Sequence, residues 1–208
     1  MTAPIQFNLT KDASAAPIAF ALSKNQAFTI ELFWNTQHDL DAHAIALSNG
    51  SLTAMGDVLS TYNPTLVLVD NPAKNHVAGG KEPFMTVNGG LIHMGDKRTG
   101  LSVNAREPDE VLKTDNTKFA THWTEVAIVV AMHPPHSGKF KDVDGARLVI
   151  KDDTGAELLE ANLTHDFDEY DIVQMGSLLK NQASGAWEFK PVAVGINGDF
   201  NAVLAAFA

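Results

Sequence analysis

Short apolar segments that alternate with polar residues at a period of two are the feature that most constrains the fold of this chain. The clearest covers residues 27–34, where four apolar side chains share one face: Phe28, Ile30, Leu32 and Trp34. Similar segments cover 41–47, 65–69, 125–132, 146–151, 157–163, 171–179 and 187–195, with turn-forming residues between them. Many short strands separated by turns predict an all-β fold, a two-sheet β-sandwich with long loops.

Other segments complete the expected organisation of the chain. Asp199 precedes residues 200–207, where apolar residues recur at helical spacing, so we predict a short C-terminal helix with Asp199 as its N-cap. Residues 1–26 are expected to form an N-terminal arm or an edge strand around 17–22. Residues 48–90 are interpreted as an insertion with long loops. The whole chain, 1–208, is expected to be a single domain.

Composition excludes several classes of protein. The net charge is −10, so phosphate groups would repel the chain and nucleic-acid binding is not expected. There is no cysteine, which excludes disulfides and thiolate zinc sites. No apolar run approaches the ~20 residues of a membrane span, and the N-terminus lacks the pattern of a signal peptide. We expect a cytoplasmic protein without a membrane span.

Two carboxylates, Asp39 and Asp41, stand two residues apart at the start of an apolar segment. Side chains in a strand alternate between faces, so both should point the same way, with Cα atoms roughly 7 Å apart. Two close anions repel each other, and a cation between them would relieve the repulsion. Calcium is the candidate because it binds hard carboxylate oxygens.

Three more carboxylates follow in turn-rich segments. Asp96 comes directly after Gly95, and Asp109 and Glu110 precede another apolar segment. Gathered at one end of a sandwich, all these groups would repel one another strongly without a cation, and together they would supply much of the shell of about 6–8 oxygens that calcium takes. We predict a site for one or two calcium ions formed by Asp39, Asp41, Asp96, Asp109 and Glu110.

Four motifs occur in order along the chain: Phe33-Trp34-Asn35, Asp39-Leu40-Asp41-Ala42, Gly95-Asp96-Lys97-Arg98-Thr99-Gly100 and Asp109-Glu110-Val111-Leu112. With the segments 126–130 and 187–195, they make most of residues 27–207 similar to the TerD family of tellurite-resistance and bacterial stress-response proteins. The resemblance implies a non-enzymatic β-sandwich that binds calcium at acidic loops on one edge. The ion would order these loops for a protein partner, with self-association left open.

The chain departs from the family pattern in two places. The family carries acidic and glycine residues where this chain has residues 101–108. The loss of these acidic residues favours a site for one ion over a site for two. It also has a small hydroxyl residue where this chain has His43. A histidine beside two carboxylates suits a transition metal, although a partly buried, hydrogen-bonded histidine is the simpler interpretation of His43.

Two other classes of function stay open. One is a structural or assembly module, for example in a phage particle, built on the same fold. The other is a metalloenzyme that uses His43 with Asp39 and Asp41. His133 and His136 flank two prolines and could also hold an ion, although a solvated loop is the simpler interpretation. The common nucleophile, phosphate-binding and zinc-protease motifs do not occur, so enzymatic activity is not expected.

Overall fold

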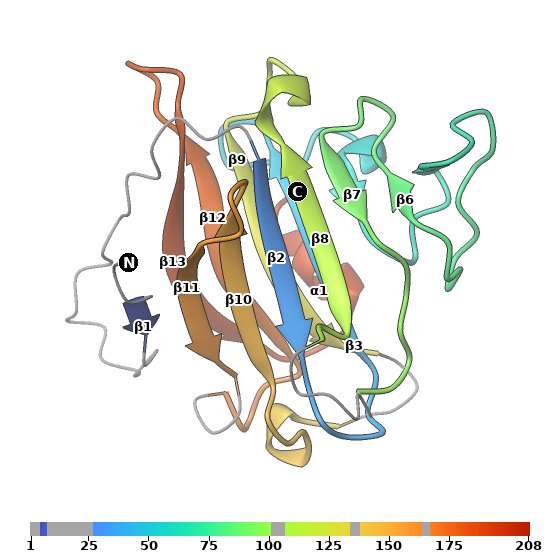
Figure 1. Cartoon of the computed structure of the whole chain (residues 1–208), viewed down its shortest axis with the longest axis vertical. Helices are drawn as coiled ribbons and strands as arrows, with labels where there is room; N and C mark the ends of the chain where they lie inside the picture. The colour runs from blue at the N-terminus through green and yellow to red at the C-terminus, as the bar shows by residue number, and fades with distance from the viewer. Residues whose placement is uncertain (1–4, 8–26, 101–106, 134–137, 164–166) are drawn as a thin grey trace.

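Two β-sheets pack face to face in the computed structural model, which describes residues 5–7, 27–100, 107–133, 138–163 and 167–208 (Figure 1). The larger sheet has the spatial order β1 (Ile5–Phe7), β11 (Glu157–Asn162), β10 (Arg147–Asp152), β2 (Ala27–Phe33), β8 (Glu110–Asp115), β7 (Leu91–His93), β6 (Phe84–Met85) and β5 (Val67–Leu68). The smaller sheet has the order β13 (Trp187–Ile196), β12 (Ile172–Lys180), β9 (Glu125–Met132), β3 (Leu40–Leu47) and β4 (Val58–Leu59).

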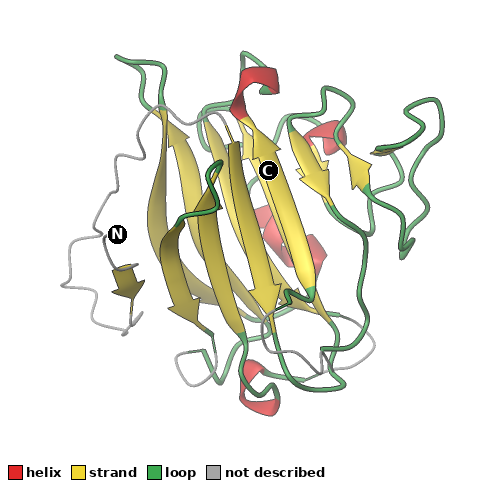
Figure 2. Ribbon diagram, in the orientation of Figure 1, coloured by secondary structure: helices red, strands yellow, loops and turns green. Residues whose placement is uncertain are grey.

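Neighbouring strands in both sheets run antiparallel, apart from β1 and β11, which are parallel. The remaining elements of the described segments are three single-turn 3-10 helices, η1 (Met55–Asp57), η2 (Asn116–Lys118) and η3 (Phe140–Asp142), and the helix α1 (Phe200–Ala206). Figure 2 shows how strands dominate the described part of the chain. The predicted two-sheet sandwich with a short C-terminal helix is confirmed.

The main core lies between the two sheets and is built from the alternation expected of half-buried strands. The predicted face of β2 is buried there, with Phe28, Ile30 and Leu32 each about 1% exposed or less. Three small residues of β3 belong to the same core, Ala42, Ala44 and Ala46. Because alanine side chains are short, β3 can lie close to the opposite sheet.

The outer face of the smaller sheet carries a second apolar cluster. Ile45 and Leu47, on the other face of β3, meet residues of β9 and Val203 of α1. Figure 1 shows α1 behind the sheets, in red. The Asp199 side chain accepts a hydrogen bond of 3.1 Å from the backbone N–H of Ala202, so the predicted N-cap is confirmed. Among the described residues, no helix combines the length and apolar character that crossing a membrane requires.

The shortest strands are where the sequence-based assignment differs from the structure. The predicted strand at 65–69 reduces to Val67–Leu68, and β4, β6 and β7 were not predicted. Elements of two or three residues are too short to show a period, and they form by pairing with neighbours. β5, β6 and β7 extend the larger sheet beyond β8, so residues 48–90 contribute strands as well as loops. The predicted strand at 17–22 lies outside the described residues.

Two adjacent leucines of β12 test the layering of the sandwich. Leu178 is 1% exposed and belongs to the main core, whereas Leu179 is partly exposed. Leu178→Ala should lower the free energy of unfolding by about 2–5 kcal/mol, because it leaves a cavity. The matched change Leu179→Ala should cost about 1 kcal/mol or less. Urea denaturation measures both, and equal losses would contradict the assigned faces.

Candidate metal centre

The first half of β3 has an edge that is not covered by another described strand. β4 pairs only with Ala44 and Ile45. The backbone N–H of Ala42 instead donates a hydrogen bond of 2.6 Å to Oε2 of Glu110. Because Glu110 is the first residue of β8, this bond links the two sheets. The end of β2, the start of β3 and the start of β8 lie together at one end of the sandwich (Figure 1).

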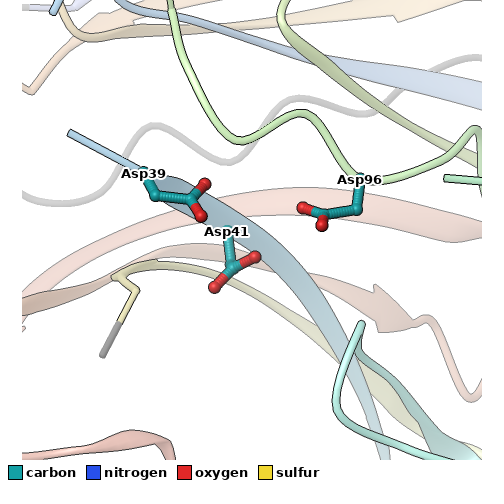
Figure 3. Close-up of side chains that lie close together, drawn as sticks. All are labelled: Asp39, Asp41 and Asp96. Carbon is teal, nitrogen blue, oxygen red and sulfur yellow. The ribbon is translucent and has the colours of Figure 1, made fainter. Parts of the chain in front are cut away.

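Three carboxylates meet beside this edge. Asp39 and Asp41 come from the start of β3, and Asp96 comes from the loop after β7; in Figure 3 the Asp96 carboxylate points toward the other two. One oxygen of each lies within 4.8 Å of the others. Gly95 places Asp96, because its φ is +111° and any side chain would clash with the Lys81 carbonyl.

The three carboxylates are buried without enough protein partners. Asp39, Asp41 and Asp96 are 6%, 1% and 6% exposed, and each Oδ1 atom has no hydrogen-bond partner in the described part of the chain. An unpaired buried carboxylate is strongly unfavourable, so charges of this kind are paired or bind metal ions. Two oxygens bound to one calcium ion are at most about 5 Å apart, since each bond is about 2.3–2.6 Å. The triad therefore has the donor set and the spacing to hold a metal ion.

The second oxygen of Asp41 is held by two side chains. His133 Nδ1 donates a hydrogen bond of 2.9 Å to Oδ2, the Tyr62 hydroxyl donates to the same oxygen, and these two partners lie 2.6 Å apart. Burial alone would raise the pKa of Asp41, but the hydrogen bond from His133, the charge of His43 and the bond from Tyr62 hold it below the ordinary value. In turn, the bond to Asp41 raises the pKa of His133. The contact therefore favours the ionised form of Asp41 and the protonated form of His133.

Asp39 behaves differently from Asp41. Its pKa is raised from 3.8 to about 6, first by burial and then by the negative charge of Asp41. Two neighbouring carboxylates whose pKa values move apart are the expected result of close like charges. The repulsion that the sequence predicted is thus present in the folded protein.

The other two predicted ligands are held by backbone donors. Asp109 Oδ2 accepts a hydrogen bond of 3.1 Å from the Trp34 backbone N–H, and its Oδ1 lies 3.2 Å from Lys97 Nζ. Glu110 is fully buried, and burial followed by the charge of Asp41 raises its pKa well above the ordinary value. The structure thus brings three of the five predicted residues into one cluster. Glu110 is bonded to Ala42, the residue after Asp41, and Asp109 contacts Lys97, the residue after Asp96.

Two histidines differ from their simplest interpretations. His43 is fully buried, and neither ring nitrogen has a hydrogen-bond partner in the described structure. Its ring packs 4.1 Å from that of Phe200, and burial lowers its pKa to about 4. The expectation that His43 is partly buried and hydrogen-bonded is therefore wrong. His133 does not lie in a purely solvated loop, because it binds Asp41; a pairing with His136 lies outside the described residues.

Tyr62 is the residue of this site that sequence reasoning missed. It lies in the segment after β4, which carries no motif, and it reaches Asp41 across 21 positions of the chain. The pairing of β4 with β3, which is seen in the structure, is what brings this segment back to the start of β3.

Comparison with known proteins identifies relatives of this chain. The sequence model of one family, described as the TerD domain, matches residues 6–207. The tellurium resistance protein TerD of an Alcaligenes species is 28% identical over 173 residues, which cover 81% of this chain and 77% of that protein. The uncharacterized protein YceE of Bacillus subtilis (strain 168) is 31% identical over 119 residues, which cover 56% of this chain and 59% of YceE.

Two solved structures share the fold. A homologue of the telluride resistance protein (TerD) from Streptomyces coelicolor A3(2) superposes with a TM-score of 0.63 at 18% identity, over 88% of this chain and 96% of that one. SAV2460, a protein of unknown function, gives a TM-score of 0.65 at 16% identity, with the same coverage. At these identities the likeness shows the fold alone.

The raised pKa of Asp39 predicts how stability changes with pH when no metal ion is bound. The folded protein binds this proton more tightly than the unfolded chain, with a pKa of about 6 against 3.8. Stability should therefore fall as the pH rises from about 4 to about 6, and Asp39→Asn should lose this part of the dependence. Urea denaturation of the chelator-treated proteins measures it. The exposed control Asp153→Asn should keep the wild-type dependence, and an unchanged slope in Asp39→Asn would count against the assignment.

Proposed function

This chain belongs to the TerD family, and on that premise we propose that it is a calcium-binding protein of the tellurite-resistance and stress-response type, without enzymatic activity. The observation that carries the proposal is the buried triad of Asp39, Asp41 and Asp96, which brings one oxygen of each carboxylate within 4.8 Å of the others and leaves each Oδ1 without a hydrogen-bond partner among the described residues. An ion with a preference for hard oxygen ligands would satisfy all three at once.

The choice of calcium follows from the oxygens that surround the triad. Glu110 Oε1 is also buried without a hydrogen-bond partner in the described residues, and Asp109 lies next to it in sequence. These two carboxylates would extend the set of oxygen ligands toward the six to eight that calcium accepts in flexible geometry. Magnesium demands a stricter octahedron and keeps most of its water. We therefore retain the full set of Asp39, Asp41, Asp96, Asp109 and Glu110 as the proposed ligands.

Calcium would act here by joining separate parts of the fold. The proposed ligands come from the start of β3, the loop after β7 and the start of β8, which belong to both sheets. An ion bound to all of them would order residues 94–100 against the end of the sandwich. We propose that the surface formed by this ordered loop is what a protein partner recognises.

A transition metal is the second candidate, because the imidazole of His133 lies close to two of the carboxylates. His133 Nδ1 lies 2.9 Å from Asp41 Oδ2 and 3.8 Å from Asp39 Oδ2, so an ion that accepts imidazole could recruit it. Calcium titration in excess magnesium, compared with zinc and manganese titrations, separates these candidates. Binding of zinc or manganese without any binding of calcium would overturn the calcium proposal.

Calcium should stabilise the folded protein, because the unfolded chain does not hold the ligands together. At a free concentration 100-fold above the dissociation constant, an ion bound only to the folded state adds about 2.7 kcal/mol. For a domain of this size, the melting temperature should rise by roughly 5–11 °C. Asp41→Asn should abolish most of this rise, because it removes one charge and keeps the shape of the side chain.

The matched control for this melt is Asp153→Asn. Asp153 is an exposed residue of the turn between β10 and β11. This variant should keep the full calcium-dependent rise in melting temperature, measured with calcium and with chelator. If Asp41→Asn also keeps the full rise, Asp41 is not a ligand and the proposed site is wrong.

A further inference from the structure

We propose that Lys97 and Arg98 are built-in competitors of the metal ion. In the absence of the ion they neutralise the acidic cluster, and the ion must displace them to bind, so they set its affinity. The inference rests on the proposed function. Both residues directly follow the proposed ligand Asp96 in the segment Gly95-Asp96-Lys97-Arg98-Thr99-Gly100.

Lys97 occupies the side of Asp109 that a metal ion would need. Its Nζ atom lies 3.2 Å from Asp109 Oδ1, while Asp109 Oδ2 accepts the hydrogen bond from the Trp34 backbone N–H. Asp109 Oδ1 is buried without a hydrogen-bond partner among the described residues, so the Lys97 ammonium faces it as a counter-charge. An ion bound to Oδ1 would have to take the place of this ammonium group.

Arg98 holds the triad in a similar way. Its Nε atom lies 3.6 Å from Asp96 Oδ2, and its Nη2 group donates a hydrogen bond of 3.2 Å to the Gly79 carbonyl. Arg98 therefore partly offsets the repulsion within the triad.

Both basic side chains are free to leave, whereas the carboxylates are fixed. The Lys97 and Arg98 side chains are 45% and 63% exposed, while those of Asp109 and Asp96 are 1% and 2% exposed. An ion pair with one exposed partner is weak and is easily exchanged for water. A divalent cation carries more charge into the same space and should therefore displace both side chains. Its binding free energy is reduced by the cost of breaking the two ion pairs.

The test is the calcium affinity of the double variant Lys97→Ala/Arg98→Ala, measured by isothermal titration calorimetry. Weak ion pairs of this kind should together reduce the affinity of the wild-type protein by about 2-fold to 30-fold, so the variant should bind calcium more tightly by that factor. In chelator, the same variant should melt at a lower temperature than wild type, because the acidic cluster loses its neutralising charges.

The matched control is the double variant Lys118→Ala/Lys151→Ala. Lys118 pairs with Asp115 at 3.1 Å, at the end of β8 opposite to Glu110, and Lys151 pairs with Glu31 at 2.6 Å, which alternates along β2 with the core residues Ile30 and Leu32. Neither of these two ion pairs includes a carboxylate of the acidic cluster. The control removes the same number of positive charges and ion pairs, so it isolates the local effect from the net charge. Its calcium affinity should stay close to that of wild type.

The outcomes separate this inference from the proposed function. If wild type binds calcium and Lys97→Ala/Arg98→Ala binds no more tightly than the control, the competition does not exist and the calcium site survives. If none of the three proteins binds calcium, both proposals are wrong. If the double variant fails to fold, calcium affinity is measured for the single variants Lys97→Gln and Arg98→Gln, which keep most of the side-chain bulk. Each should bind calcium more tightly than wild type.

Discussion

Mutual repulsion among buried carboxylates is the constraint around which one end of this sandwich is arranged. Three of the five carboxylates there are held by different donors: Asp41 by His133 and Tyr62, Asp109 by a backbone N–H and Lys97, and Glu110 by the N–H of Ala42. None of these donors forms a hydrogen bond with the buried Oδ1 atoms of Asp39, Asp41 and Asp96. The remaining repulsion is what the proposed cation would relieve.

Much of the fold could be predicted from the sequence because its signals are local. The alternation of apolar residues in β2 and the helical spacing in α1 each lie within one continuous segment, and both elements form where the pattern places them. The same alternation places Asp39 and Asp41 together, since residues two apart in a strand share a face. The order of acidic motifs then identified the family, which connected these residues to Asp96.

The remaining features depend on contacts between distant segments, which a local pattern cannot contain. Tyr62 and His133 reach Asp41 from 21 and 92 positions away, through the pairing of β3 with β4 and β9. Asp109 and Glu110 were treated as one pair, yet adjacent residues entering a strand point to opposite sides. One therefore binds the Trp34 backbone, and the other turns between the sheets to Ala42.

The position of β3 has a consequence for folding on the ribosome. β3 pairs along its whole length with β9, and its outer face is covered by α1, which follows more than 150 positions later. The segments that carry the acidic residues are therefore synthesised before the strand and the helix that hold β3 in place. Contacts of such long sequence separation form slowly, so the nascent chain carries these carboxylates exposed to solvent until the last strands dock. We expect their mutual repulsion to oppose aggregation of this segment during that interval.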